Sequence, residues 1–142
     1  MSRLKERQQK IVQEFSAVPD WEERYKKVIA LGKELPSLDD QYKTEKYIIK
    51  GCQSEAWMFA EMNDNGEVIY KADSEAMISR GIVHLLMKVY SQATPDEILG
   101  TEPDFVKEIG FESNLTPSRA NGLFAMLKMM RYYAMAFKAM GH

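Results

Sequence analysis

Cysteine is almost absent from this sequence of 142 residues, which contains one, Cys52. A single cysteine excludes an internal disulfide, a Cys-x-x-Cys redox pair and a thiolate-rich zinc site within one chain. Any chemistry at Cys52 therefore proceeds without a second cysteine of the same chain.

The sequence also lacks a concentration of charge of one sign and a long apolar run. Its 19 basic and 21 acidic residues are scattered and give a formal net charge of −2, so no positive field is gathered to hold a phosphate backbone. No stretch approaches the roughly 18 consecutive apolar residues of a membrane span. Residues 1–10 are strongly polar, unlike a signal peptide. We expect no nucleic-acid partner, no membrane span and a cytoplasmic protein.

Three motif types that would point to a cofactor or to hydrolysis are missing. The sequence contains no Gly-rich phosphate loop, no metal-ligand spacing and no paired-carboxylate motif. We therefore expect this chain to bind no cofactor and no metal.

The hydrophobic content of 45% is enough for a packed core in a chain of this length. We predict one domain over residues 1–142. Its first half begins with a helix over about Lys5 to Phe15. Asp20 then caps a second helix, with Glu23 completing a capping-box pattern, and Leu35-Pro36 closes it.

The middle of the chain has the pattern of a small antiparallel sheet. Short strands are predicted at Tyr47–Ile49, Ser54–Met62 and Glu67–Ala72, which are rich in β-preferring residues. Asn65-Gly66 separates the last two, and this dipeptide adopts the positive backbone angles of a tight hairpin turn.

Helices return in the second half of the chain. Ser74 is a suitable cap for a helix that runs to about Tyr90, and Thr94-Pro95 and Thr116-Pro117 each mark a helix start. The last helix is long, and its wide apolar arc indicates burial on two sides or a partner. Because strands and helices do not alternate, we predict an α+β fold with a small antiparallel sheet packed against helices.

Cys52 lies between two predicted strands, directly after Gly51, which permits unusual backbone geometry. A loop presents a thiol to a partner better than a helix does. A nucleophilic thiol must ionise, and Lys50 is the nearest cation in the sequence that would favour the thiolate. The alternative is an inert, buried cysteine, since free cysteine is among the most buried residue types.

Several segments resemble, in order, those of SufE-type sulfur acceptors. The most specific are Gly51-Cys52-Gln53-Ser54 followed by Trp57, and Leu115 to Arg119 with Gly122. The others are Asp20 to Tyr25, Leu31-Gly32 with Leu35-Pro36, and Asp73-Ser74 before a helix. The resemblance runs nearly end to end, with one departure: Ala72 stands where family members often have glycine.

The resemblance implies a SufE/IscU-like fold with the reactive cysteine at the tip of a loop. It implies that Cys52 takes persulfide sulfur from a SufS-like cysteine desulfurase, stimulates that enzyme, and passes the sulfur to a SufBCD-like iron–sulfur cluster scaffold. Pyridoxal phosphate belongs to the desulfurase. On this view the chain is a sulfur-transfer partner and activator rather than an independent enzyme.

The supporting residues that we expect around Cys52, in the loop or at the partner surface, are Lys50, Gly51, Gln53, Asp73 and Arg119. Arg119 falls in the first turn of the last helix, where the helix dipole disfavours a cation. It is either part of an ordinary ion pair or a partner contact. Met126, Met129 and Met140 are further contact candidates, and the apolar arc of this helix would also allow a homodimer.

Two other hypotheses stay open from the sequence. In the first, Cys52 is the nucleophile of a stand-alone thiol enzyme with His84 as base. Arg80, His84 and Lys88 follow each other at steps of four residues, which predicts a solvated basic ridge instead. In the second, the chain is an interaction module in which Cys52 is inert.

Overall fold

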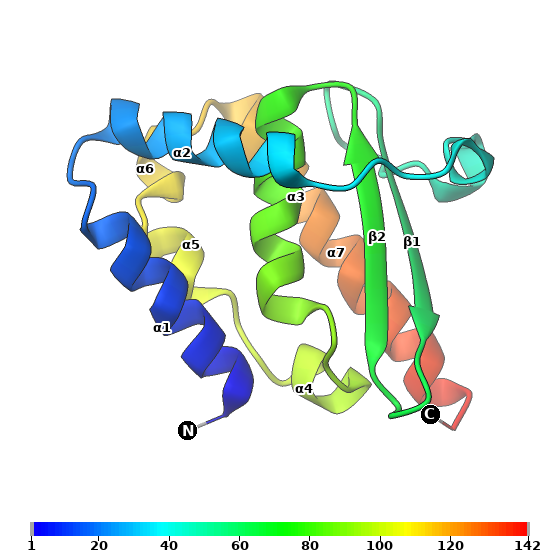
Figure 1. Cartoon of the computed structure of the whole chain (residues 1–142). Coiled ribbons are helices and arrows are strands. Elements are labelled where there is room, and N and C mark those ends of the chain that lie inside the picture. The colour runs from blue at the N-terminus through cyan, green and yellow to red at the C-terminus, as the bar shows by residue number, and fades with distance from the viewer. Residues whose placement is uncertain (1, 142) are drawn as a thin grey trace.

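The computed structural model describes residues 2–141 as a sequence of helices with one β-hairpin (Figure 1). The elements are α1 (Arg3–Ser16), α2 (Trp21–Glu34), the 3₁₀ turns η1 (Asp40–Tyr42) and η2 (Glu45–Tyr47), β1 (Ala56–Met62), β2 (Val68–Ser74), α3 (Met77–Tyr90), α4 (Pro95–Leu99), α5 (Asp104–Glu108), α6 (Phe111–Asn114) and α7 (Pro117–Ala139). The predicted α+β class, a small antiparallel sheet packed against helices, is confirmed.

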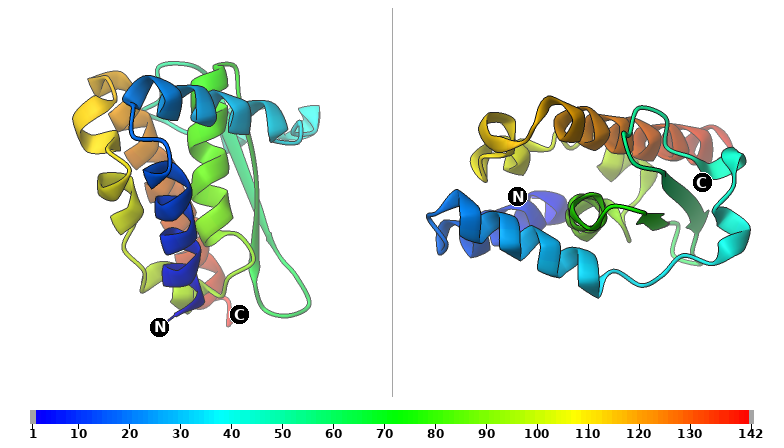
Figure 2. Two further views of the ribbon diagram at one scale, coloured as in Figure 1. Left: turned by 60° about the vertical axis from the view of Figure 1, so that its left-hand side comes forward. Right: turned by 90° about the horizontal axis from the view of Figure 1, so that it is seen from above.

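The elements form three layers, with α3 and the hairpin in the middle (Figure 2). On one side lie α1 and α2, and on the other lies α7 with the short helices α4 to α6. Helix α2 crosses α3 closely, because Gly32 of α2 lies against the backbone of Met77 and Gly81 of α3 lies against the backbone of Val28. A Cβ on Gly81 would overlap the carbonyl of Val28.

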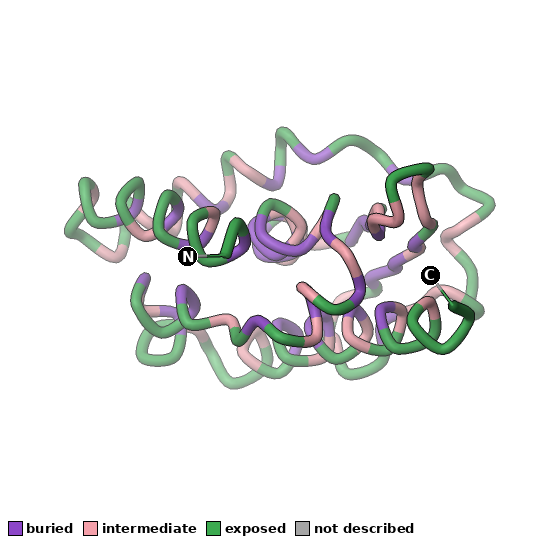
Figure 3. Tube along the Cα trace, turned by 90° about the horizontal axis from the view of Figure 1, so that it is seen from below, coloured by how far each residue is buried: buried purple, intermediate pink, exposed green. Residues whose placement is uncertain are grey.

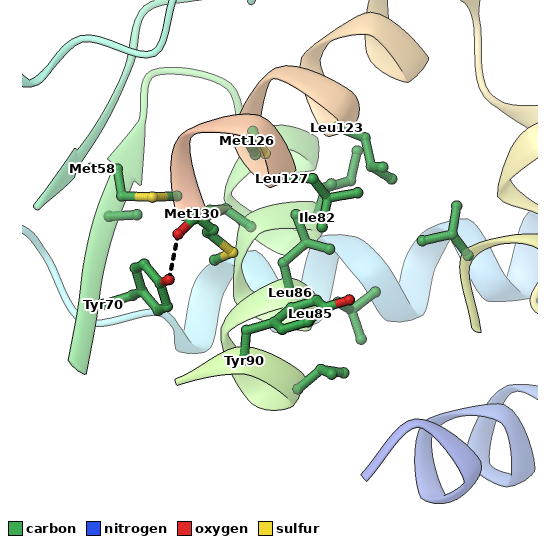
Figure 4. Packing of buried hydrophobic residues seen from close by; sticks show 14 of the residues in the cluster. Met58, Tyr70, Ile82, Leu85, Leu86, Tyr90, Leu123, Met126, Leu127 and Met130 are labelled. Carbon is green, nitrogen blue, oxygen red and sulfur yellow. Dashed lines mark hydrogen bonds between the residues drawn. The ribbon is translucent and has the colours of Figure 1, made fainter. Parts of the chain in front are cut away.

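The core lies between α3, α7 and the hairpin (Figure 4). Ile82, Leu85 and Leu86 of α3 are at most 2% exposed. Tyr70 of β2 is equally buried, and its hydroxyl donates to the carbonyl of Met130 at 2.6 Å. This hydrogen bond satisfies a hydroxyl that burial would otherwise leave unpaired, and it fixes β2 against α7.

The hairpin pairs β1 with β2 in a regular antiparallel register from Ala56 opposite Ser74 to Met62 opposite Val68. Its turn differs from the predicted two-residue form. Only Gly66 has a positive φ, of 75°, and the Asn63 side chain accepts from the backbone N–H groups of residues 65 and 67. The loop is therefore longer than a two-residue turn, and the hydrogen bonds of the Asn63 side chain hold its conformation.

Two predictions for the middle of the chain were wrong. Tyr47–Ile49 is not a strand: Tyr47 ends a 3₁₀ turn, and only Ile48 forms an isolated bridge, to Trp57. Ser74 does not cap α3, since it is the last residue of β2 and Ala76 is the N-cap. Its hydroxyl nevertheless accepts from the Ala76 N–H, just before α3 begins.

The two helix starts predicted at Thr-Pro are confirmed. The helix start predicted at Asp20 is also confirmed, but its capping hydrogen bond differs from the predicted one. Thr94 and Glu97 form a capping box, and the Thr116 hydroxyl accepts from the Arg119 N–H at 3.3 Å. Asp20 accepts from the Glu22 N–H, so its cap is a simple one rather than a capping box. Among the described helices, none is both long and apolar enough to cross a bilayer.

Candidate functional site

The segment that carries Cys52 is a short loop closed at its base by the sheet. The Ile49 N–H donates to the Ala56 carbonyl at 2.8 Å, which brings the two ends of the loop together. At its bend Gly51 has φ of 102°, a conformation that a side chain would strain. A Cβ on Gly51 would also stand 3.2 Å from the Ala125 side chain, so glycine lets the loop lie directly on α7.

Cys52 is half-buried and faces α7 rather than solvent. Its Sγ lies 3.8 Å from the carbonyl oxygen of Gly122, to which the thiol donates a weak hydrogen bond. A Cβ on Gly122 would stand 3.5 Å from the same sulfur. Small residues at 122 and 125 thus form a shallow notch on α7 in which the cysteine loop sits.

A cavity of about 100 Å³ adjoins the thiol. Its wall is apolar where Ile78, Ile82 and Met126 contribute, and polar where Ser79, Ser118 and Arg119 contribute. A water molecule needs only about 10–15 Å³ of such a cavity. The cavity is therefore large enough for a second sulfur atom attached to Cys52.

Burial raises the pKa of the Cys52 thiol. Lys50 does not counteract this effect, because it is exposed and does not line the cavity. In this conformation burial therefore disfavours the thiolate, which is the nucleophilic form of Cys52. Movement of the loop, or a partner that changes the surroundings of the sulfur, would remove this effect of burial on the thiol.

Arg119 is the cation that lines the Cys52 cavity. It is half-buried, and its guanidinium lies 5.4 Å from the ring centre of Tyr25 in α2. Within residues 2–141 this arginine forms no ion pair with a carboxylate, and its stacking on Tyr25 holds it near the helix start. Gln53 also lines the cavity, so the structure brings Cys52, Gln53 and Arg119 together.

Asp73 lies elsewhere, buried at the end of β2. It forms ion pairs with Arg80 of α3 and with Lys43, and it accepts from the backbone N–H groups of Leu38 and Ser74. Burial by itself would raise the pKa of this carboxyl, but the two N–H groups and the two cations outweigh it and lower the pKa. Asp73 ties the segment after α2 to α3, and it does not line the Cys52 cavity.

The sequence predicted that Arg80, His84 and Lys88 form a solvated basic ridge on α3. This prediction is wrong for Arg80 and His84. The Arg80 side chain is 15% exposed, and besides Asp73 it binds the carbonyls of Gly32 and Leu35 at the end of α2. His84 Nδ1 lies 2.7 Å from the Leu31 carbonyl. His84 does not line the Cys52 cavity, so the structure does not pair it with the thiol.

Several residues of the site are not predictable from the sequence, chiefly Ile78, Ser79, Ile82 and Ser118. No local pattern identifies them, because they come from α3 and α7 and meet only through tertiary packing. Gly122 was a signal that could have been used, since glycine inside a helix costs stability and often marks a close approach.

The other cavities among the described residues contain no cysteine. Another cavity, of about 470 Å³, is lined by β2 residues and by the segment from Leu35 to Tyr42. Within residues 2–141, no group of three or more His, Cys, Asp or Glu side chains is placed to hold a metal ion.

Comparison with solved structures supports the fold. A solution structure of a hypothetical protein from Thermus thermophilus has a TM-score of 0.77 and 20% sequence identity to this chain, over 94% of this chain and 96% of that one. At this identity the likeness concerns the fold alone.

Comparison with protein sequences shows the family. SufE-like protein 1 of Arabidopsis thaliana, named chloroplastic/mitochondrial, is 37% identical over 94% of this chain, which spans 36% of the Arabidopsis protein. An uncharacterized SufE-like protein of Synechocystis is 37% identical over 91% of this chain and 80% of its own length. The family model SufE, described as an Fe-S metabolism associated domain, matches residues 9–134. The chain therefore belongs to the SufE family, which is associated with iron–sulfur metabolism.

Proposed function

We propose that this protein accepts sulfur from a cysteine desulfurase and carries it as a persulfide on Cys52. The observation that supports this most is the cavity beside the thiol. It adjoins a cysteine on a glycine-hinged loop, and it has room for one more sulfur atom. An inert structural cysteine needs neither the loop nor the empty space.

The transfer is a thiol–persulfide exchange. The Cys52 thiolate attacks the outer sulfur of a persulfide on the desulfurase, a bond forms between the two sulfurs, and the donor S–S bond breaks. The donor cysteine leaves as a thiolate, and Cys52 now bears the outer sulfur. No net oxidation or reduction occurs, and the freed desulfurase can turn over again.

The loop must open before this step and close after it. In the closed state burial raises the pKa of the thiol and so disfavours the thiolate, and the sulfur lies against the Gly122 carbonyl of α7. On binding, the partner takes the loop into its own site, where Cys52 ionises. After transfer, closure places the outer sulfur in the cavity, away from bulk thiols that would reduce it.

Two partners follow from this function. The donor is a SufS-like cysteine desulfurase, whose pyridoxal phosphate generates the persulfide, and the acceptor is a SufBCD-like scaffold of cluster assembly. Arg119 is the residue we assign to the donor surface, because it is a half-exposed cation at the rim of the cysteine cavity. The protein activates the desulfurase by removing its product sulfur and is not an independent enzyme.

The test is intact-mass measurement without reductant after incubation with a cysteine desulfurase and cysteine. Wild type should gain one sulfur atom, reversibly on addition of a thiol reductant, and Cys52→Ser should gain none. Wild type that gains no sulfur while the desulfurase remains active would refute the carrier function. In that case Cys52→Ser should still bind and stimulate the partner, as an interaction module would.

A stand-alone thiol enzyme is a weaker candidate, because His84 binds the Leu31 carbonyl and does not line the Cys52 cavity. His84→Ala separates the two functions. A carrier keeps its sulfur uptake in this variant, whereas an enzyme that needs His84 as base loses its activity.

A further inference from the structure

The edge of β2 that faces away from β1 is a row of backbone donors and acceptors. Just beyond the hairpin strands, the Glu75 N–H donates to the Glu55 carbonyl, so these two residues form a hydrogen-bonded pair. Antiparallel strands alternate between hydrogen-bonded and non-hydrogen-bonded pairs. Positions 73, 71 and 69 of β2 are therefore bonded to β1. The N–H and carbonyl groups of Tyr70 and Ala72 point outward instead, away from β1.

Only the first half of this edge finds partners within residues 2–141. Val68 forms two backbone hydrogen bonds of 2.8 Å with residues 92 and 93, and the Tyr70 N–H donates to the Ser91 hydroxyl at 3.0 Å. Among the described residues, none pairs with the Tyr70 carbonyl, the Ala72 N–H or the Ala72 carbonyl. Tyr70 and Ala72 are each 2% exposed, and unpaired backbone groups in buried residues are uncommon.

The cavity of about 470 Å³ adjoins this unpaired stretch. Tyr70 and Ala72 line it, and its other walls come from residues 35–42 and from Met87 of α3. The segment after α2 runs past the end of β2 (Figure 1). Exposed residues follow each of the two buried leucines of this segment (Figure 3). The volume is that of a ligand-binding cleft, and unpaired backbone groups form part of its wall.

The two ends of this space differ in charge. It adjoins a second cavity of about 330 Å³, because Ile69 and Met87 line both. Arg7 and Lys88 line the second cavity, and Lys88 is exposed and forms no ion pair within the described residues. The wall formed by residues 35–42 contributes one charged side chain, Asp39. We call the two cavities together the β2 groove; it is basic at one end and acidic at the other.

We propose that the β2 groove binds an extended segment of a partner protein as a short added strand, antiparallel to β2. An extended backbone is the ligand whose donors and acceptors match a free strand edge. Residues 91–93 already pair with β2 in this sense, and the added segment continues their line. Its residue opposite Ala72 accepts from the Ala72 N–H and donates to the Ala72 carbonyl. The residue two positions later donates to the Tyr70 carbonyl.

The groove also specifies side chains of the segment. Leu35, Leu38 and Met87 make the walls largely apolar, so valine suits the positions opposite Ala72 and Tyr70. The residue between these two positions shares a face with Lys71 and is acidic. In the antiparallel direction the segment ends near Lys88 and begins near Asp39. A basic start and an acidic end therefore complement the groove.

The β2 groove and the Cys52 cavity share no lining residue. A segment bound in the groove thus leaves the cysteine loop free, and the inference goes beyond the carrier function proposed above. It stands or falls by measurements that involve no sulfur transfer.

Titration of the isotope-labelled protein with the peptide acetyl-Lys-Thr-Val-Glu-Val-Thr-Glu-amide, followed by amide NMR, tests the proposal. The Ala72 amide should move downfield and exchange with solvent more slowly. N-methylation of the first valine removes the N–H aimed at the Ala72 carbonyl and should weaken binding about tenfold. N-methylation of the central glutamate is the matched control. Its N–H points away from β2, so the Kd should stay within about twofold.

Two protein variants test the same contacts from the other side. Ala72→Pro removes the outward N–H without breaking the ladder to β1, a change that edge strands tolerate, and it should weaken peptide binding about tenfold. Lys88→Glu should weaken binding several-fold, and a peptide with lysine as its last residue should restore it. Lys26→Glu, on α2 and outside the groove, should bind like wild type.

Circular dichroism melting shows that each variant is folded, and the pair of N-methylated peptides on wild type decides the matter if Ala72→Pro is not. No shift of the Ala72 amide with up to about 1 mM peptide would overturn the proposal. Equal weakening by both N-methylations would overturn it too, because the peptide would not be bound as a strand. An Ala72 shift that follows protein concentration alone would assign the edge to a second copy of this chain instead.

Discussion

At the scale of single residues, the environment of Cys52 opposes its reactivity in the closed loop. Burial raises the pKa of the thiol, and its one hydrogen bond is a long one to the Gly122 carbonyl. The sequence predicted a loop cysteine next to a helpful cation, Lys50. The structure places that lysine in solvent and places Arg119 beside the cavity instead. We therefore expect Cys52 to react only after the loop has moved away from α7.

The fit of the loop against α7 can be tested at Gly122. A Cβ there would make ordinary contact with the Cys52 sulfur, at 3.5 Å, so Gly122→Ala should leave the loop closed and raise helix stability by about 0.5–1 kcal/mol. Gly122→Val adds two further methyl groups that would enter the space of the sulfur. We expect it to displace the loop and speed labelling of Cys52 by iodoacetamide several-fold at pH 7.

Gly122→Ala is the control, and its labelling rate is measured in parallel. It shows whether faster labelling comes from crowding of the Cys52 sulfur by the valine methyl groups or from the replacement of glycine as such. Equal rates for wild type, Gly122→Ala and Gly122→Val would show that α7 does not hold the loop closed. A rise in both variants would point to loss of helix packing, which circular dichroism would detect.

At the scale of elements, the structure depends on a few buried junctions that local sequence does not reveal. Asp73 and Arg80 are seven positions apart, and they meet only because the chain reverses between β2 and α3. The Thr-Pro helix starts and the β1–β2 hairpin were predictable, because their signals lie within a few residues. Helices α5 and α6 have five and four residues, too few for an apolar period, and packing rather than pattern determines them.

Removal of the Asp73 charge should destabilise the protein in a pH-dependent way. Asp73→Asn leaves Arg80 without its carboxylate in a site where its side chain is 15% exposed, and breaking such a buried pair costs about 3 kcal/mol or more. The folded pKa of Asp73 lies below the unfolded value, which is about 3.9. The ionised Asp73 carboxylate therefore stabilises the folded state fully at pH values above the unfolded pKa. This stabilisation is lost as the pH falls through the folded pKa.

Urea unfolding at pH 7 and at pH 3 measures this effect. The gap in unfolding free energy between wild type and Asp73→Asn should be large at pH 7 and smaller at pH 3. Asp40→Asn is the control, since its carboxylate is 98% exposed and contacts Lys43 only at 3.9 Å. A variant that loses as much stability at position 40 as at position 73 would contradict this account of the buried pair.

The crossing of α2 and α3 depends on the absence of a side chain at position 81. A Cβ there would overlap the backbone of Val28, so Gly81→Ala should separate the two helices. We expect a loss of about 2–3 kcal/mol, typical of overpacking, despite the better helix propensity of alanine. Gly122→Ala has the same chemical change with room for the methyl group, and its midpoint in urea should not fall.

At the scale of the whole molecule, we expect residues 1–142 to unfold as one unit. Trp21 packs on Phe111, with ring centres 5.8 Å apart, and joins α2 to α6. Trp57 is 8% exposed in the hairpin. Trp21→Phe and Trp57→Phe leave one tryptophan each, in different layers of the fold. For each variant, the unfolding transition in urea followed by tryptophan fluorescence should coincide with the transition followed by circular dichroism on the same variant.

Non-coincident transitions for the two tryptophan variants would show that the hairpin and the α1–α2 layer unfold separately. The three-layer arrangement argues against this, because α3 packs on α2 and on the hairpin alike (Figure 2).

The base of the cysteine loop bears on the speed of the proposed sulfur uptake. Among the described residues, positions 50–54 form no backbone hydrogen bonds to other segments, and the bond from Ile49 to Ala56 closes the loop below them. Opening therefore breaks no rung of the sheet, and such loops move in nanoseconds to microseconds. Enzymes commonly turn over only about 10 times per second. For the sulfur uptake proposed above, we therefore expect encounter with the donor and the chemical step, rather than loop opening, to limit the rate.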